Sequence, residues 1–232
     1  MVDPKIIEIL ENVSTPTITT LLVNKGLRKI WMRGPVPSAA GPRIVGPAFT
    51  LRFIPAREDL ATTASWASPR STRAAIEDMP AGCIAVASAF NCADAGIFGD
   101  ILCARMAQRG VKGLVTDGVL RDVSGVRASG LAVWSRGFAA PPSVSGLLFV
   151  GWQEPIGCGG VAVYPHDLIV ADADGAVVIP AEYVDDVVKD GPEQERREAW
   201  IMHEVEKGAA LPGLYPMNAE TRARYEAASK DD

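Results

Sequence analysis

Residues 83–134 alternate apolar, strand-like runs with helical segments, and this order restricts the fold more than any other feature of the chain. Glycine, proline or serine separates the successive segments, as is usual where one element ends and the next begins. Strand, helix and strand in this order predict a parallel sheet with helices packed against it. The expected strands are residues 83–87, 114–116 and 131–134, and the expected helices are residues 100–109 and 121–128.

The chain on either side of this block changes in character. Two short helices are expected within residues 4–26, a strand of the central sheet at 46–53 and a helix at 71–79. After Pro141, short β segments follow one another without helices between them. A charge-rich helix over 183–205 comes next. We therefore predict an α/β fold with a mixed sheet, a β-rich second half and a C-terminal helix, in one domain spanning residues 1–232. Its expected core covers about 15–208, and the C-terminal helical extension and tail cover about 181–232.

Composition excludes several classes of function. Of 232 residues, 48% are hydrophobic and 22% charged, which are ordinary globular values that provide for a sizeable core. The net charge of −5 and the absence of a Lys/Arg run argue against nucleic acid as a partner. No apolar stretch approaches the roughly 20 residues that cross a bilayer, so we expect no membrane contact and a cytoplasmic protein. The four cysteines lack zinc-type pairing and are expected to be free thiols, mostly buried.

Several common catalytic patterns are missing. Only His166 and His203 are present, in a turn and on a helix, so histidine catalysis and histidine-based zinc sites are disfavoured. No serine lies in a G-x-S-x-G motif, and the glycine cluster at 157–160 matches neither G-x-G-x-x-G nor the Walker A loop. The remaining candidates for catalysis are carboxylate and arginine side chains.

Acidic residues follow two neighbouring strands of the predicted sheet. Asp100 opens the helix after the first strand, while Asp117, Arg121 and Asp122 follow the second. Because loops at the carboxyl ends of parallel strands gather around a common crevice, these residues are expected to converge. Helix N-terminal amides and an arginine can hold an anionic oxyacid, and carboxylates can hold a hard cation.

The spacing of these residues resembles that of a known family. Twenty residues separate Asp100 from the Arg121-Asp122 pair, and this D-x20-R-D pattern resembles the RraA-like family. That family includes the metal-dependent class II pyruvate aldolases acting on 4-hydroxy-4-methyl-2-oxoglutarate and 4-carboxy-4-hydroxy-2-oxoadipate. The resemblance extends over roughly residues 15–208 and includes the segments 46–50, 99–102, 109–113, 117–122 and 172–180. It implies a β/β/α swivelling-domain-like fold, assembled as homotrimers or homohexamers with active sites at subunit boundaries.

The resemblance also implies roles for individual residues. Asp122 looks like the direct ligand of Mg²⁺ or Mn²⁺, and Arg121 looks like the catalytic, substrate-binding arginine. Asp100 is similar to the catalytic carboxylate that holds metal-bound water. The backbone amides that bind the pyruvyl carboxylate are implied to come from one short turn, made of Gly99, Asp100, Ile101 and Leu102.

Such a site suits a metal-dependent lyase that releases pyruvate. Cleaving a 4-hydroxy-2-oxoacid leaves an enolate, which a cation and Arg121 stabilise, and oxaloacetate loses CO₂ through the same enolate. In related aldolases a glutamate from a neighbouring subunit's C-terminal helix helps to hold the metal, and Glu195 or Glu198 could fill that role here. The resemblance leaves the physiological substrate and the preferred metal open.

Two alternatives remain at this level. One is a non-catalytic RraA-like regulator that binds an RNA-degrading endonuclease, because a fold does not carry function by itself. The other is a different enolate-forming lyase, such as a sugar-acid dehydratase. The chain departs from many relatives at Thr20 and His166, while residues 65–70 offer a place for substrate selection, with Arg70 a candidate for a distal carboxylate.

Overall fold

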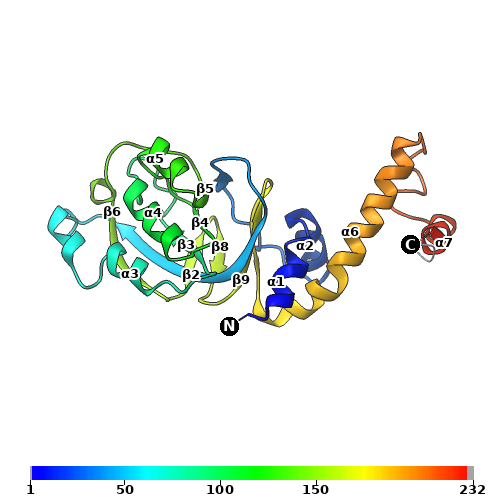
Figure 1. Ribbon diagram of the computed structural model, residues 1–232, viewed down its shortest axis with the longest axis horizontal. Coiled ribbons are helices and arrows are strands. Elements are labelled where there is room, and N and C mark those ends of the chain that lie inside the picture. Colours follow the sequence, from blue (N-terminus) through cyan, green and yellow to red (C-terminus); the bar gives the residue numbers. More distant parts are fainter. Residues whose placement is uncertain (1, 229–232) are drawn as a thin grey trace.

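The computed structural model describes residues 2–228 and is built around a mixed sheet of eight strands (Figure 1). Seven of them follow the order β1-β5-β4-β3-β2-β9-β10, and β6 pairs with β2. A separate pair is formed by β7 (Ile156–Cys158) and β8 (Val161–Val163). The sheet strands are β1 (Val36–Pro37), β2 (Ile44–Pro55), β3 (Ile84–Ser88), β4 (Gly113–Thr116), β5 (Ala132–Ser135), β6 (Leu147–Trp152), β9 (Leu168–Asp172) and β10 (Gly175–Ile179).

The predicted crossover units are confirmed. Strands β2, β3, β4 and β5 run parallel in register, and every residue of β3 and β4 is buried. Three helices connect them, namely α3 (Thr72–Asp78), α4 (Asp100–Gln108) and α5 (Val123–Ala128). Figure 1 shows α4 and α5 side by side against the sheet, and the carboxyl ends of β3 and β4 lead to their first turns.

Strand β2 joins the two halves of the fold because its 12 residues have different partners along their length. Its first part pairs antiparallel with β9, from Ile44 opposite Ala171, and its second part pairs parallel with β3. The later strands are all antiparallel to their neighbours, without a helix between β6 and β10. The α/β class with a β-rich second half is therefore confirmed.

The N-terminal helices and the long C-terminal helix cover the β9–β10 end of the sheet. Helices α1 (Pro4–Leu10) and α2 (Thr15–Asn24) pack on α6 (Val184–Glu206), and their apolar side chains form one cluster with β9 and β10. Ser14 caps α2 by accepting a hydrogen bond from Thr17 N. Both N-terminal helices and α6 were predicted from the sequence.

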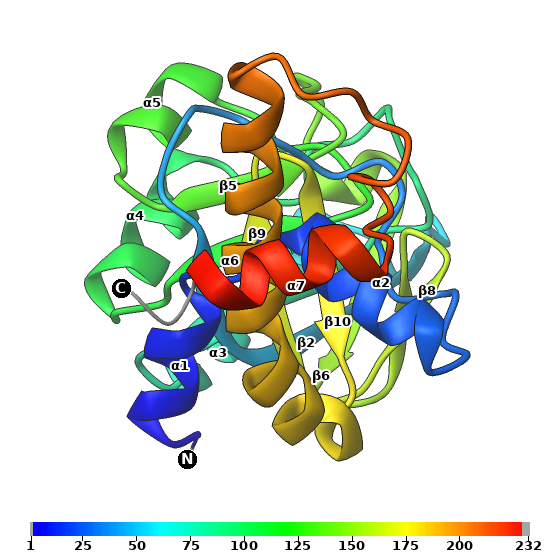
Figure 2. The same ribbon diagram turned by 90° about the vertical axis from the view of Figure 1, so that its right-hand side faces the viewer.

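Helix α6 extends beyond the body of the molecule and carries α7 (Ala219–Ala228) at its far end (Figures 1 and 2). The rings of Trp200 and Tyr225 meet edge to face at 5.6 Å, and Tyr225 Oη donates to Glu193 Oε1 at 3.0 Å. Helix α7 was not predicted, because its sequence has little amphipathic pattern of its own. We call residues 200–228 the arm.

Within residues 2–228 there are also three short 3₁₀ helices, η1 (Thr63–Ala67), η2 (Ser143–Ser145) and η3 (Ala181–Tyr183). In the part of the chain described, no single helix is long and apolar enough to cross a membrane, although α1 and α2, bent by 103°, pass that test as a pair by length and composition. The cysteines are free, as expected, and only Cys92 is less than fully buried. Burial raises the pKa of Cys83 to about 11 and that of Cys103 to about 12.

Candidate active site

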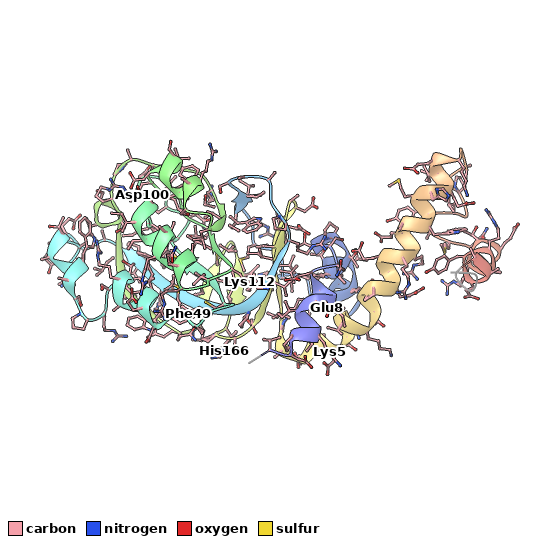
Figure 3. The ribbon with its side chains drawn as sticks, viewed as in Figure 1. Lys5, Glu8, Phe49, Asp100, Lys112 and His166 are labelled. Carbon is pink, nitrogen blue, oxygen red and sulfur yellow. The ribbon has the colours of Figure 1, made fainter. Side chains whose placement is uncertain are left out.

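The predicted site residues lie where α4 and α5 begin. Gly99 is the N-cap of α4 and Asp100 its first residue, while Asp122 is the N-cap of α5 in a left-handed conformation (φ 55°). Figure 3 shows Asp100 near the start of α4, on the edge of the sheet where β3 and β4 end. The parallel pairing of β3 with β4 thus brings the start of α4 close to the start of α5, although about 20 residues separate them in the sequence.

Two glycines show how closely the carboxylates approach each other's helix. A Cβ built on Gly99 would lie 2.5 Å from Asp122 Oδ2, and one built on Gly125 would lie 2.5 Å from Asp100 Cβ and 2.7 Å from its Oδ2. Each carboxylate therefore packs against the first turn of the other helix, at a position where only glycine leaves room. We call the region where these two first turns meet, with Asp100 on one and Asp122 on the other, the crevice.

Arg121 is held at the rim of this crevice. Its backbone N donates to Phe98 O at 3.0 Å, and its Nε donates to Asp122 Oδ2 at 3.1 Å. The side chains of Arg121 and Asp122 are 36% and 43% exposed, so their charged groups remain open to solvent. The pair is positioned by the fold and accessible to a small anionic ligand.

A shallow pocket opens beside the pair. Its walls come from the first turn of α5 and from the segment after β5, so the carboxyl ends of two strands contribute to it. The lining residues are Arg121, Asp122, Val123, Ser124, Gly125, Phe138, Ala139 and Ala140. An arginine, a carboxylate and an aromatic ring around one hollow suit a small organic acid.

The oxygen atoms present fit a divalent cation that keeps part of its water. Among residues 2–228, no cluster of three or more His, Cys, Asp or Glu side chains could hold a metal ion. Mg²⁺ and Mn²⁺ nevertheless bind commonly through one or two carboxylates and retain several waters. The carboxylates of Asp100 and Asp122, on the adjoining first turns of α4 and α5, could supply oxygen ligands of that kind.

The segment expected to bind the substrate carboxylate forms the first turn of α4. Asp100 Oδ1 accepts a hydrogen bond from Ile101 N at 2.7 Å, while the Ile101 side chain is 78% exposed. Leu102 packs partly against the core and holds the turn on the sheet. Of the four predicted residues, Gly99 lies against Asp122 and Asp100 lies against Gly125.

The two C-terminal glutamates are engaged within their own chain. Glu195 Oε1 accepts a hydrogen bond from Ser14 N at 2.7 Å, and Glu198 Oε1 accepts one from Gln194 Nε2 at 2.5 Å. In Figure 1, α6 lies across the molecule from the start of α4. Neither residue belongs to the Asp100–Asp122 crevice of the same chain.

The two histidines lie outside the site. His166 adopts a left-handed turn (φ 72°) and its backbone N donates to Ala48 O, at the amino end of the parallel strands. Figure 3 shows it well away from Asp100. His203 sits on α6 with its Nδ1 4.0 Å from Glu206 Oε2. Residues 65–70 border a separate pocket with residues 143–150, and Arg70 Nη2 lies 3.6 Å from Glu154 Oε1.

The sequence interpretation missed Gly125. Its only signal is a glycine inside a helix of six residues, where alanine would be the better helix former. A glycine in that position indicates that another group approaches closely, and here the group is Asp100.

Known proteins are similar to this chain over about two thirds of its length. The chain matches the family model described as RraA-like, Aldolase/RraA, over residues 15–178. A protein of Halalkalibacterium halodurans named "Putative 4-hydroxy-4-methyl-2-oxoglutarate aldolase" is 31% identical over 154 residues, covering 66% of this chain and 67% of that protein. Protein DlpA of Legionella pneumophila is 28% identical over 152 residues; that match covers 66% of this chain but only 24% of DlpA.

Solved structures share the fold. RraAS2 of Streptomyces coelicolor, described as an unusual member of the RNase ES inhibitor RraA protein family, has a TM-score of 0.77 and 34% identity, covering 86% of this chain and 96% of that one. An uncharacterized protein from Pseudomonas syringae pv. tomato has a TM-score of 0.78 at 25% identity, covering 92% and 98%. The family model, the relatives and the shared fold agree, and the chain belongs to the RraA-like (Aldolase/RraA) family.

Proposed function

We propose that this protein is a divalent-metal-dependent lyase that releases pyruvate from small 2-oxoacids. The observation that carries the proposal is the packing of Asp122 against Gly99 and of Asp100 against Gly125, because it brings two carboxylates and the guanidinium of Arg121 to the place where α4 and α5 begin. The substrates would be 4-hydroxy-2-oxoacids, cleaved between C3 and C4 by a retro-aldol reaction. Oxaloacetate would be decarboxylated at the same site, because it passes through the same pyruvate enolate.

Each residue has a chemical task in this proposal. The first-turn amides of α4 would bind the pyruvyl carboxylate, with the amide of Ile101 released from its hydrogen bond to Asp100 Oδ1. The guanidinium of Arg121 would face the oxygen on which the enolate charge develops. Asp100 would accept the C4 hydroxyl proton, directly or through a water molecule. Asp122, together with Asp100, would hold Mg²⁺ or Mn²⁺, whose positive charge would stabilise the enolate.

A regulatory role is the second candidate, and one observation favours it. RraAS2, which is 34% identical, is described as belonging to an RNase inhibitor family. A regulator would need a protein-binding surface but no arginine and carboxylate beside an open pocket. The exposure of Arg121 and Asp122 beside that pocket supports the enzyme.

Replacing Asp122 by Asn tests the lyase proposal. We expect pyruvate release from oxaloacetate in Mn²⁺, followed by a coupled assay, to fall about 100-fold or more, because the carboxylate nearest to Gly99 is lost. The control is Asp59→Asn, since Asp59 forms a similar exposed pair with Arg57 at 2.7 Å but lies outside the crevice. It should keep wild-type activity.

The same assay should be run with several 4-hydroxy-2-oxoacids as substrates, in Mg²⁺ and in Mn²⁺. Undiminished turnover in the Asp122→Asn protein would reject the assignment of the metal site. A wild-type protein without turnover on any substrate, but with a ribonuclease captured stoichiometrically, would reject the enzyme in favour of the regulator.

A further inference from the structure

Asp117 is a buried carboxylate that the proposed chemistry does not use. It is 3% exposed and follows β4, where its Oδ1 accepts a hydrogen bond from Ala89 N at 2.7 Å and its Oδ2 accepts one from Gly159 N at 3.3 Å. None of the ion pairs among residues 2–228 includes it. Burial raises the pKa of Asp117. Burying an ionisable carboxylate costs free energy even when backbone amides satisfy its hydrogen bonds. A carboxylate in this position is therefore expected to have a role.

Ala89, whose backbone N–H donates to Asp117 Oδ1, is the first residue of a strained turn. Phe90 and Asn91 both have left-handed φ angles, 54° and 55°, and Cys92 N donates to Ala89 O at 2.9 Å to close the turn. Asparagine tolerates this conformation, but a phenylalanine in it costs about 1 kcal/mol or more. The turn therefore needs outside support, and the carboxylate of Asp117 supplies it at the preceding residue.

The same turn begins the segment that leads to the candidate site. Residues 89–99 connect β3 to α4 and end at Gly99. Near their far end, Ile97 N donates to Val119 O at 2.9 Å and Phe98 O accepts from Arg121 N at 3.0 Å. The segment is thus held at its root by Asp117 and at its end by the chain that carries Arg121.

We propose that Asp117 is a positioning residue, which holds the Phe90–Asn91 turn and thereby sets the first turn of α4 against Arg121. This inference rests on the proposed function, since it assigns to that turn the binding of the substrate carboxylate. Aspartate is required because both oxygens accept hydrogen bonds from amides. Asparagine has only one acceptor oxygen, and its NH₂ group would face a second donor.

The test compares Asp117→Asn with Asp172→Asn. Asp172 is also a buried strand-end aspartate, 8% exposed, and accepts from Thr15 N at 2.9 Å and Asp174 N at 3.0 Å, outside the site. For Asp117→Asn in saturating Mn²⁺ we expect the KM for oxaloacetate to rise about 10-fold with kcat within about twofold, because ground-state binding is lost. Asp172→Asn should lose stability without that change in KM.

A second variant separates positioning from general destabilisation. Phe90→Gly removes the cost of the left-handed conformation, so it should restore the KM in the Asp117→Asn background. If Asp117→Asn alone does not yield folded protein, the double variant carries the test. A KM that stays at the wild-type value in Asp117→Asn, or that Phe90→Gly does not restore, would overturn the proposal.

Amide hydrogen exchange tests the role of Asp117 separately from the proposed lyase activity. We expect residues 89–102 to exchange at least 10-fold faster in Asp117→Asn than in the wild type, and not in Asp172→Asn. This readout does not depend on turnover. An inactive wild-type protein would reject the lyase, whereas unchanged exchange in this segment would reject the role of Asp117 in holding it.

Discussion

At the scale of single residues, the site depends on two carboxylates that approach the backbone so closely that only glycine fits beneath each of them. Asp122 Oδ2 lies against Gly99, and Asp100 lies against Gly125, so the two glycines allow the carboxylates to pack on adjoining first turns. The backbone of Gly99 does not itself require glycine, since its φ of −115° is open to any residue. Its value lies in the missing Cβ.

Gly99→Ala should therefore damage activity more than stability. The added methyl group would push Asp122 Oδ2 from its place, and a displacement of about 1 Å at a reacting centre costs about 100-fold in kcat/KM. The free energy of unfolding, measured with urea, should change by less than about 1 kcal/mol. Gly157→Ala is the matched control, because nothing lies within 4 Å of its Cβ. Equal activity in the two variants would show that Asp122 does not need its observed position.

At the scale of elements, the docking of α6 on the N-terminal helices depends on two contacts. A Cβ on Gly191 would lie 2.9 Å from Val13 Cγ1 and Cγ2, so the helices touch at that point. One turn later Glu195 accepts from Ser14 N, the first residue before α2. Burial opposes ionisation of Glu195, but hydrogen bonds from Ser14 outweigh it and hold the pKa of this carboxyl below its usual value.

Glu195→Gln should lower the stability in a manner that depends on pH. Because the folded-state pKa is depressed, the ionised carboxylate stabilises the protein above the ordinary pKa of 4.5, and this contribution is lost as the pH falls through the folded value. At pH 7 we expect a loss of about 1 kcal/mol in the free energy of unfolding, which shrinks below pH 4.5. Glu206→Gln, 68% exposed on the same helix, is the control. A difference that grows in acid would contradict the assignment.

At the scale of the whole molecule, the arm extends away from the sheet and its covering helices (Figure 1). Met202, Leu211 and Tyr215 are 59%, 54% and 60% exposed there, although they are large apolar residues. Contacts within the arm fix α7 against α6, because the guanidinium of Arg224 lies over the ring of Trp200 at 5.6 Å. We propose that these side chains are buried against another copy of the chain, in the homotrimer or homohexamer that the family resemblance implies.

Sedimentation velocity at micromolar concentration checks this assembly. The wild type should sediment as a trimer or hexamer, and Met202→Glu combined with Leu211→Glu should shift most of it to smaller species, because two charges would be buried without partners. Leu60→Glu is the control, since Leu60 is 46% exposed in the segment before η1, at the other end of the molecule in Figure 1. A wild type that sediments as a single subunit would contradict the proposal.

Much of this structure was predictable because its signals are local. The apolar run at 83–87 and the helical pattern at 100–109 appear as β3 and α4 with boundaries shifted by one residue. Pairings between distant segments leave no such signal. The two sets of partners along β2 and the packing of α7 on Trp200 were therefore not predicted.

The sequence by itself determined the α/β class and the crossover order, because periodicity and turn residues act along the chain. The assignment of Asp100, Arg121 and Asp122 to a site, made from the D-x20-R-D spacing, stays a prediction. Only the tertiary structure decided that Asp122 lies over Gly99, that Asp100 lies over Gly125 and that Glu195 is used within its own chain. These relations depend on the parallel pairing of β3 with β4 and on the direction in which α6 leaves the sheet. Contacts of this kind form between residues that no short stretch of sequence contains.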